Sequence, residues 1–497
     1  MISKIYSRAL AGMDAPQVVV EVHVASGLPS FSIVGLPDTE IKESRDRVRS
    51  AIQNSGFDFP ARRITVNLAP ADLPKESSRY DLPIALGIVL AAKLIKPAIN
   101  IDEYEFAGEL ALDGALRAVK GALAMAFGIH NQKRKFILPL ESAKEASLID
   151  ELEIYGADSL NSVLKHISNE SALPKLKYQL DTTQIHSVLD ISQVKGQIAT
   201  KKALEIAAAG RHSLLMIGNP GCGKSMLAER IKTILPNLPT DKSIETASLY
   251  SMSNIGFHPS MWQKTPFRSP HHSTSSTALV GGGSNPKPGE ISLAHNGVLF
   301  LDELPEFDRK VLEVLREPLE SKKISISRAN KKADYLADFQ LIAAMNPCPC
   351  GNKGHQQKMC KCSVEQINRY SAKISAPLLD RIDIVVEVPS LSASELQNLQ
   401  NGESSATILK RIEKARLRQL NRQNKLNYEL SNEEIENLCK LDTKTSNLVK
   451  QICEKQGLSA RGYYRMLKLS LTIADLDGDD NVTIKHISLA SQYKRII

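Results

Sequence analysis

The sequence has no long apolar run. None of its hydrophobic stretches reaches the roughly 18 to 20 residues that a membrane-spanning helix needs, and its first residues lack the apolar region and cleavage site of a secretory signal. Long internal repeats and low-complexity tracts are absent as well. The seven cysteines, an odd number in a long chain, argue against a disulfide framework and leave metal binding or simple burial. We therefore expect a soluble, cytoplasmic protein without a membrane partner.

The composition is that of a protein that folds around hydrophobic cores. The chain has 497 residues, 42% of them hydrophobic and 24% charged, and this length suggests about three domains. A net charge of +8 permits an anionic partner such as nucleic acid, although so mild an excess also occurs in proteins that bind none.

The most informative motif is a glycine-rich stretch between a predicted strand at residues 213–217 and a helical pattern at 226–231. It is a phosphate-binding P-loop made of Gly218, Asn219, Pro220, Gly221, Cys222, Gly223, Lys224 and Ser225. Backbone N–H groups at such a strand-to-helix turn surround a triphosphate, while the lysine reaches the β and γ phosphates and the serine ligates Mg²⁺. We predict ATP and Mg²⁺ as cofactors, with Met226 among the nucleotide-binding residues.

Two other apolar runs end in residues suited to hydrolysis. Residues 297–301 lead into Asp302 and Glu303, a Walker B pattern in which the aspartate holds Mg²⁺ through its water shell and the glutamate polarises the attacking water. Residues 339–345 lead into Asn346, whose side chain is placed to sense the γ-phosphate. Because the ends of parallel strands face one crevice, we expect these residues to converge on the P-loop. A core strand that merely ends at a solvated acidic turn is the alternative.

The pattern along the chain predicts an α/β protein with three regions. Residues 1–167 alternate strand-like runs at 18–24 and 64–68 with helical stretches at 45–54 and 81–92, and 168–190 has the composition of a linker. Residues 191–389 repeat strand and then helix, as in a parallel sheet flanked by helices. Residues 390–497 predict a helical bundle with helices at 393–400, 406–425, 432–440, 445–456, 460–476 and 484–491.

Two arginines lie beyond the Asn346 strand. Arg381 stands within Leu378–Asp383, and Arg461 opens a predicted helix. Their order and spacing resemble the arginine finger and sensor 2 of AAA+ ATPases, in particular the branch with magnesium chelatase subunits and MCM helicases. The resemblance implies that Arg381 reaches the γ-phosphate of a neighbouring subunit and that Arg461 contacts the γ-phosphate from a helical lid. Solvated or salt-bridged surface arginines are the alternative.

Longer runs carry a closer resemblance over essentially the whole chain. They are residues 6–12, 31–38, 267–272, 280–283, 288–296 and 304–307. They are similar to the YifB/ComM family of magnesium-chelatase-like competence proteins. This implies a homo-hexameric motor that acts on single-stranded or branched DNA, driving branch migration beside recombination proteins during natural transformation. An ATPase of protein-remodelling or chelatase type that does not act on DNA is the alternative.

Two segments bear on DNA binding. The predicted helix from Lys410 to Lys425 has seven basic residues and one acid, Glu413, but a solvated face or a subunit contact explains such a run more often than DNA does. Residues 281–289 are rich in glycine and proline and predict an exposed loop. In this AAA+ branch an insertion here points toward the pore of the ring, where Lys287 would touch a DNA phosphate. A plain flexible connection is nearly as good an explanation.

The N-terminal region resembles the proteolytic domain of Lon at residues 108–114 and 136–139. Lon uses a serine nucleophile activated by a lysine. Alignment of the neighbouring motifs places Arg79 at the serine position and Met125 at the lysine position, and neither can perform that chemistry. The alternative is a shifted dyad drawn from Ser77, Ser78 and Lys120. We expect a Lon-like domain without the dyad that serves interaction or assembly.

Four cysteines form two C-x-C pairs separated by nine residues, Cys348, Cys350, Cys360 and Cys362. Four thiolates from one short loop suit tetrahedral Zn²⁺. The spacing departs from the commoner C-x2-C, and His355 is an alternative ligand. Four free cysteines are the competing interpretation. Because the loop follows Asn346 at once, a zinc ion would stiffen the segment between that residue and Arg381.

Overall fold

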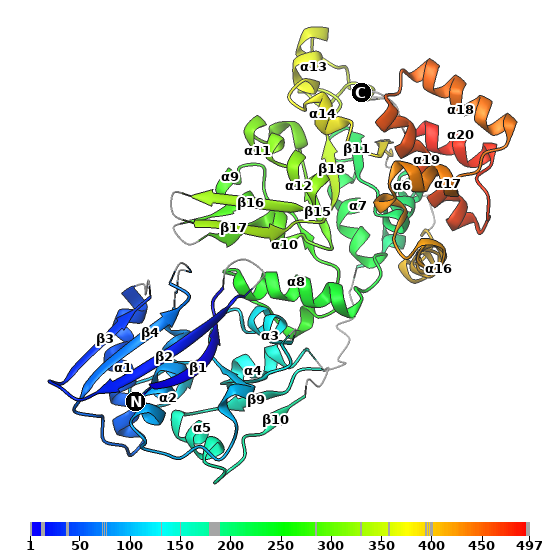
Figure 1. Ribbon diagram of the computed structural model, residues 1–497. Coiled ribbons are helices and arrows are strands. Elements are labelled where there is room, and N and C mark those ends of the chain that lie inside the picture. The colour runs from blue at the N-terminus through cyan, green and yellow to red at the C-terminus, as the bar shows by residue number, and fades with distance from the viewer. Residues whose placement is uncertain are drawn as a thin grey trace. The chain divides into compact units, whose positions relative to one another are not determined.

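The computed structural model describes residues 2–10, 15–35, 39–71, 73, 75, 77–130, 132–149, 151–177, 189–283, 286–328, 331–355, 358–392, 395, 397 and 401–493. They form two compact units (Figure 1). The N-terminal unit combines Met1–Thr183 with Thr240–Trp262 and Ser327–Tyr335, and the motor unit comprises Gln184–Pro239, Gln263–Ile326 and Leu336–Ile497. The region expected to form one motor domain, residues 191–389, is thus interrupted twice by segments of the other unit.

An eight-stranded sheet forms the centre of the N-terminal unit, in the order β10-β9-β8-β5-β1-β2-β4-β3. Its strands are β1 (Ile2–Arg8), β2 (Gln17–Ala25), β3 (Ser30–Val34), β4 (Arg63–Ala69), β5 (Tyr104–Phe106), β8 (Lys135–Pro139), β9 (Ile154–Ala157) and β10 (Lys175–Leu176). Alternate residues of β2, from Val18 to Val24, are buried, so one face of this strand covers the core. A small separate ribbon pairs β6 (Glu109–Leu110) with β7 (Leu116–Arg117).

The helices of this unit are α1 (Thr39–Asn54), α2 (Asp81–Ala91), α3 (Ala122–His130), α4 (Leu140–Ala146), α5 (Leu160–Ile167) and α8 (Thr240–Met252). The strands and helices predicted for residues 18–92 are confirmed. Helix α2 packs closely on β2 because Gly87 has no side chain, and a Cβ there would lie 2.4 Å from Val22. Helix α8 packs against α3, and Ala247 and Trp262 share a core cluster with Leu123.

The first part of the predicted linker, residues 168–190, belongs to the N-terminal unit. Lys175 and Leu176 pair with β9 and so belong to the N-terminal sheet. Residues 178–188 of that segment lie outside the described residues.

A five-stranded parallel sheet forms the centre of the motor unit, in the order β12-β15-β18-β11-β19. Its strands in chain order are β11 (Leu214–Gly218), β12 (Phe267–Arg268), β15 (Val298–Leu301), β18 (Gln340–Met345) and β19 (Ile384–Val388). The strand before the P-loop, β11, is the first of the five in the sequence, and in the sheet it lies between the last two, β18 and β19. Its surrounding helices are α6 (Ile198–Gly210), α7 (Lys224–Arg230), α9 (Ser276–Val280), α10 (Glu290–Leu293), α11 (Arg309–Val314), α12 (Arg316–Ser321), α13 (Val364–Ser371) and α14 (Ala376–Leu379).

Two short antiparallel ribbons interrupt this pattern. One pairs β16 (Lys323–Arg328) with β17 (Lys331–Leu336), and the other pairs β13 (Gly281–Gly282) with β14 (Lys287–Pro288). The second ribbon corrects the prediction of an exposed loop at 281–289 for its two ends, whereas Gly283 is exposed and residues 284 and 285 lie outside the described residues. Gly281 and Pro288 are buried, and a Cβ on Gly281 would lie 2.3 Å from the Lys287 carbonyl oxygen, so the glycines serve close strand pairing.

The C-terminal region is helical, as predicted, with α16 (Ser405–Gln423), α17 (Asn432–Leu438), α18 (Thr443–Gln456), α19 (Ala460–Asp477) and α20 (Ile484–Gln492) (Figure 1). Most of the helix expected at 393–400 lies outside the described residues. Helices α16 and α19 pack on α6 and share its hydrophobic core, for example through Ile412, Leu467 and Ala207. In the part of the chain that is described, no helix has both the length and the apolar character needed to cross a membrane.

Candidate nucleotide site and cysteine cluster

The P-loop forms the turn between β11 and α7. Gly221 and Gly223 have φ angles of 79° and 93°, a left-handed conformation that favours glycine, and a Cβ on either would meet nothing within 4 Å. Gly218 is packed, since a Cβ there would lie 2.6 Å from the Val388 carbonyl oxygen on β19. The turn therefore leaves open space beside its backbone at the start of α7, and the backbone N–H groups of such a turn bind phosphate at a helix N-terminus.

Lys224 lies at the start of α7 and is buried. Its Nζ donates to the carbonyl oxygens of Gly218 at 2.7 Å and Asn219 at 3.0 Å and to Asn346 Oδ1 at 3.1 Å. Asn346 reaches this point because β18 runs parallel to β11, with Met345 paired to Ile217. The structure thus brings the P-loop lysine and the expected γ-phosphate sensor into direct contact.

The Walker B residues follow β15, on the other side of β18 from β11. The Ser225 hydroxyl donates a hydrogen bond to Asp302 Oδ2, so the two predicted Mg²⁺ ligands touch. Glu303 comes next, in a left-handed conformation with φ 52°. Hydroxyl and carboxylate oxygens are the ligands that Mg²⁺ prefers, so Ser225 and Asp302 fit this ion, and the open turn fits the phosphates of a nucleotide.

Several residues around this site lie outside the P-loop and Walker B motifs of the sequence. His272 Nε2 lies 3.7 Å from Glu303 Oε2 and is the polar side chain beside the expected catalytic carboxylate. Gln197 Nε2 donates to the carbonyl oxygens of Pro389 at 2.7 Å and Cys222 at 3.5 Å, which ties the start of α6 to the P-loop. Next to it Ile198 is 81% exposed, and Met226 on α7, already predicted to bind nucleotide, is 47% exposed. Such exposed apolar side chains suit a nucleotide base, but a sequence does not distinguish an exposed isoleucine such as Ile198 from a core residue.

The two predicted γ-phosphate arginines meet at one carboxylate. Arg381 is buried, pairs through Nη2 with Glu320, and donates through Nη1 to the Pro377 carbonyl oxygen at 2.6 Å. Arg461 is half-exposed, and it lies 3.0 Å from Glu320 and 3.5 Å from Asp380. Among the described residues neither arginine contacts the P-loop. Their roles toward the γ-phosphate stay predictions.

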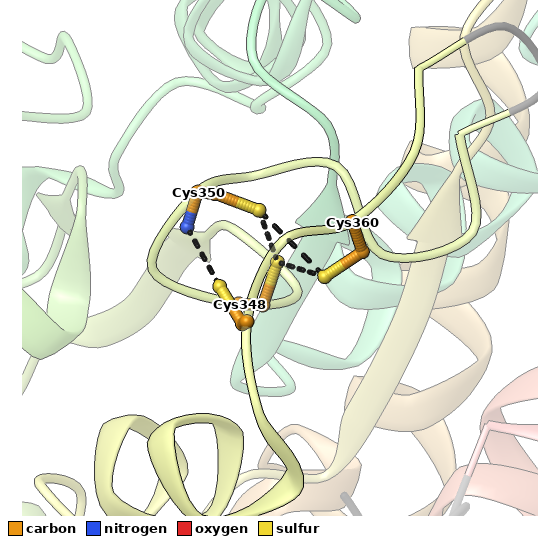
Figure 2. A group of neighbouring side chains, drawn as sticks. Cys348, Cys350 and Cys360 are labelled. Carbon is orange, nitrogen blue, oxygen red and sulfur yellow. Dashed lines mark hydrogen bonds between the residues drawn. The ribbon is translucent and has the colours of Figure 1, made fainter.

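The four cysteines of the C-x-C pairs gather within one loop. The sulfur of Cys348 lies 3.5 Å from that of Cys350 and 3.7 Å from that of Cys360, and those of Cys350 and Cys360 lie 3.6 Å apart (Figure 2). All four ligand atoms, Cys362 included, lie within 4.8 Å of one another. Tetrahedral zinc with Zn–S bonds of about 2.3 Å separates its sulfurs by about 3.8 Å. The cluster therefore fits a zinc ion, and the group does not include His355.

Backbone N–H groups support thiolates in this cluster. The N–H of Cys350 donates to Cys362 Sγ at 3.4 Å, and that of Lys353 donates to Cys348 Sγ at 3.4 Å. Hydrogen bonds from the backbone N–H groups of Asn352 and Lys361 lower the pKa of Cys350 to about 6. Such bonds stabilise the charged sulfur that metal binding requires. Despite the N–H of Cys350, desolvation and the neighbouring thiols raise the pKa of Cys362 to about 12, so Cys350 ionises before Cys362.

In the N-terminal unit, the positions aligned with the Lon dyad lie side by side. Arg79 is buried, and its Nη1 lies 3.8 Å from Met125 Sδ. Its Nε donates to the Ser77 hydroxyl at 3.0 Å. The Ser78 hydroxyl donates to Glu109, and Lys120 is exposed. The two residues that the alignment placed at the dyad positions are thus neighbours in the structure. The Lon-like character of this unit and its role in interaction or assembly stay predictions.

Most of the basic helix is neutralised within the motor unit. Arg411 pairs with Glu205 and Glu403, and Arg416 donates to the Ala208 carbonyl oxygen at 2.7 Å. The other pairs join Arg418 to Asp480, Arg422 to Asp475 and Lys425 to Glu434. Lys410 and Lys414 are exposed. Five of the seven cations are thus engaged within the unit: Arg411 and Arg416 contact α6, and the other three pair within the C-terminal helical region. Neither the solvated face nor the subunit contact offered as alternatives to DNA binding included this internal pairing. Lys287, the other DNA candidate, is half-buried on β14.

The sequence of this chain is similar to those of known protein families and individual proteins. Three family descriptions match it: "Subunit ChlI of Mg-chelatase" at residues 20–142, "Magnesium chelatase, subunit ChlI" at 190–396, and "Magnesium chelatase, subunit ChlI C-terminal" at 402–494.

The competence protein ComM of Haemophilus influenzae is 46% identical over 99% of this chain and 97% of its own length. The uncharacterized protein YifB of Escherichia coli is 47% identical over 100% of this chain and 97% of its own. The magnesium-chelatase 67 kDa subunit of Heliobacterium mobile is 26% identical over 46% of this chain and 38% of its own. The chain therefore belongs to the YifB/ComM family of magnesium chelatase ChlI-like AAA+ ATPases.

Proposed function

We propose that this protein is an ATP-driven DNA motor that works as a homo-hexamer and promotes branch migration. The observation that carries the motor part is the convergence of Lys224 with Asn346 and of Ser225 with Asp302 beyond the ends of three consecutive parallel strands, β15, β18 and β11. The DNA part is supported by similarity over the full chain to a protein named for competence. Natural transformation requires incoming single strands to pair with a chromosome, and moving the resulting branch point consumes energy.

Each residue of the site has a distinct task in this proposal. ATP supplies the phosphoryl group whose transfer to water releases energy, and Mg²⁺ offsets charge on the phosphates. Lys224 neutralises the β and γ phosphates, and Asn346 orients both that lysine and the γ-phosphate. Ser225 and Asp302 would hold Mg²⁺. Glu303 accepts a proton from the attacking water, and His272, 3.7 Å away, positions its carboxylate.

The function is tested by measuring ATP hydrolysis with and without forked DNA, together with branch migration of a four-way junction. We expect DNA to stimulate hydrolysis and Lys224→Ala to abolish both reactions, since the ammonium group contacts the reacting phosphates. Junctions moved by the Lys224→Ala protein would show that the motor assignment is wrong.

A second candidate, an ATPase that remodels a protein partner or acts as a chelatase does, is favoured by one specific observation. Five of the seven cations on the basic helix are occupied by carboxylates or a carbonyl group of the same unit, which removes them as evidence for DNA. Hydrolysis that is vigorous and indifferent to every form of DNA would support this candidate against the first.

The two candidate DNA contacts differ in their predicted response to substitution. Lys287→Ala should weaken single-stranded DNA binding several-fold and lower the slope of log K against log salt by about one, because one phosphate contact is lost. Lys410→Ala, an exposed cation on the neutralised helix, is the matched control and should change neither quantity. Fluorescence anisotropy over a range of salt concentrations measures both. The reverse result would assign DNA binding to the helix.

A further inference from the structure

The segment between β18 and α13 that carries the four cysteines, residues 346–363, is called the cysteine loop below, and it contacts the P-loop directly. Asn219 is buried, and its side-chain amide donates to the carbonyl oxygens of Gly351 at 2.5 Å and Lys353 at 3.2 Å. Gly351 has a φ of 75°, and a Cβ there would lie 2.5 Å from the ring of Pro220. The cysteine loop thus contacts two P-loop residues, Asn219 through hydrogen bonds and Pro220 through close packing, and both lie between Gly218 and Gly221.

The contact continues into the nucleotide site. The backbone carbonyl oxygen of Asn219 accepts a hydrogen bond from Lys224 Nζ at 3.0 Å, so Asn219 joins the cysteine loop to the lysine that is expected to bind phosphate. On its other side the Asn219 amide oxygen accepts from the Ser390 hydroxyl at 3.4 Å. A displacement of the cysteine loop would therefore leave the buried amide of Asn219 without its two acceptors and free the first half of the P-loop.

The cysteine loop has little else to hold its shape. Between Met345, where β18 ends, and Val364, where α13 begins, the described residues contain no helix or strand. Met359 is 90% exposed, and Cys348 is the one fully buried hydrophobic residue among them. A segment this short and this poor in buried apolar surface needs a cross-link, and the converging sulfurs of Figure 2 supply the ligands for one.

We propose that a Zn²⁺ ion bound by Cys348, Cys350, Cys360 and Cys362 holds this loop against Asn219 and Pro220, so that metal occupancy sets the affinity of the P-loop for nucleotide. The proposal builds on the ATP site proposed above and is independent of whether the motor acts on DNA. Zinc here is a structural part of the nucleotide site, and it acts through the position of Asn219.

The test measures zinc content and nucleotide affinity in the same full-length preparations. The purified protein should contain one zinc per chain. The double variant Cys360→Ser/Cys362→Ser should lose the metal and bind a fluorescent ATP analogue, with excess Mg²⁺ present, about tenfold more weakly, the loss expected when two buried hydrogen bonds are released. Cys453→Ala, a cysteine of the lid far from the loop in sequence, should change neither quantity.

A second variant keeps the test decisive if the cysteine variant folds poorly. Asn219→Ala should retain its zinc yet lose a similar factor in nucleotide affinity, which separates the hydrogen-bonded contact from the metal itself. Metal analysis that finds no zinc in the wild-type protein would overturn the proposal. So would zinc-free protein, prepared by chelation and dialysis, that binds the analogue with wild-type affinity. Neither measurement involves DNA, so failure of the proposed DNA function would leave both readouts unchanged.

Discussion

Replacing Arg381 by alanine should lower the turnover of the assembled ring by about 10³-fold or more while leaving the affinity for ATP nearly unchanged, as expected for an arginine that acts on the transition state from a neighbouring subunit. In the single chain Arg381 is buried against Glu320, so its action in a ring requires this carboxylate to release it. Steady-state hydrolysis and equilibrium binding of an ATP analogue measure the two quantities.

Mixing two inactive variants distinguishes action between subunits from action within one. A ring that contains both Arg381→Ala and Lys224→Ala chains has interfaces at which one subunit provides an intact lysine and its neighbour an intact arginine. If Arg381 acts in trans, mixing should restore part of the hydrolysis, whereas neither variant hydrolyses ATP by itself. A mixture as inactive as its components, although it assembles into hexamers, would place the arginine in its own subunit or in a structural role with Glu320.

Replacing Glu105 by alanine should destabilise the N-terminal sheet by about 3 to 5 kcal/mol, because it leaves a buried guanidinium without its counter-charge. The Glu105 side chain is fully buried on β5, and it accepts from Arg8 Nε at 2.7 Å, Arg8 Nη2 at 2.8 Å and Gln17 Nε2 at 3.0 Å. The Arg8 side chain is only 4% exposed. Hydrogen exchange in β1 and β5 measures this opening free energy without requiring the two units to unfold together.

Glu103 provides the matched control two residues away. Its carboxylate is 54% exposed and lies 3.5 Å from Lys135, so Glu103→Ala should change the same opening free energy by less than about 1 kcal/mol. Replacing both buried partners, as in Arg8→Met/Glu105→Leu, should restore most of the stability lost in Glu105→Ala. If Glu105→Ala and Glu103→Ala have equal effects, burial does not determine the strength of this ion pair.

Local features of the motor were predictable from sequence. The strand that leads into the P-loop, the two strands that end in Asp302 and Asn346, and most C-terminal helices are specified by short-range patterns that do not depend on packing. Parallel pairing then brings the polar ends together, so the contacts of Lys224 with Asn346 and of Ser225 with Asp302 follow from the pattern.

Contacts between segments distant in sequence were not predictable in this way. An asparagine at position 219 has no pattern that indicates a hydrogen bond to Gly351, 132 residues away. The same holds for the convergence of Arg381 and Arg461 on Glu320 and for the burial of Gly281, whose glycine-rich surroundings are also typical of exposed loops. Each depends on which surface another segment happens to cover, and the composition of a single segment contains no information on that.

Helix α8 has a practical consequence for how this protein can be divided. The helix lies in the sequence between the P-loop and the Walker B strand, yet its Ala247, together with Trp262 in the segment that follows it, belongs to the core cluster that contains Leu123 of α3. A truncated protein that ends before residue 190 would expose this apolar face of α3 to water, and one that begins there would expose the matching face of α8. Both halves would be prone to aggregate. Experiments on the motor should therefore use the complete chain. The contribution of the N-terminal unit is better tested by point substitutions than by truncation.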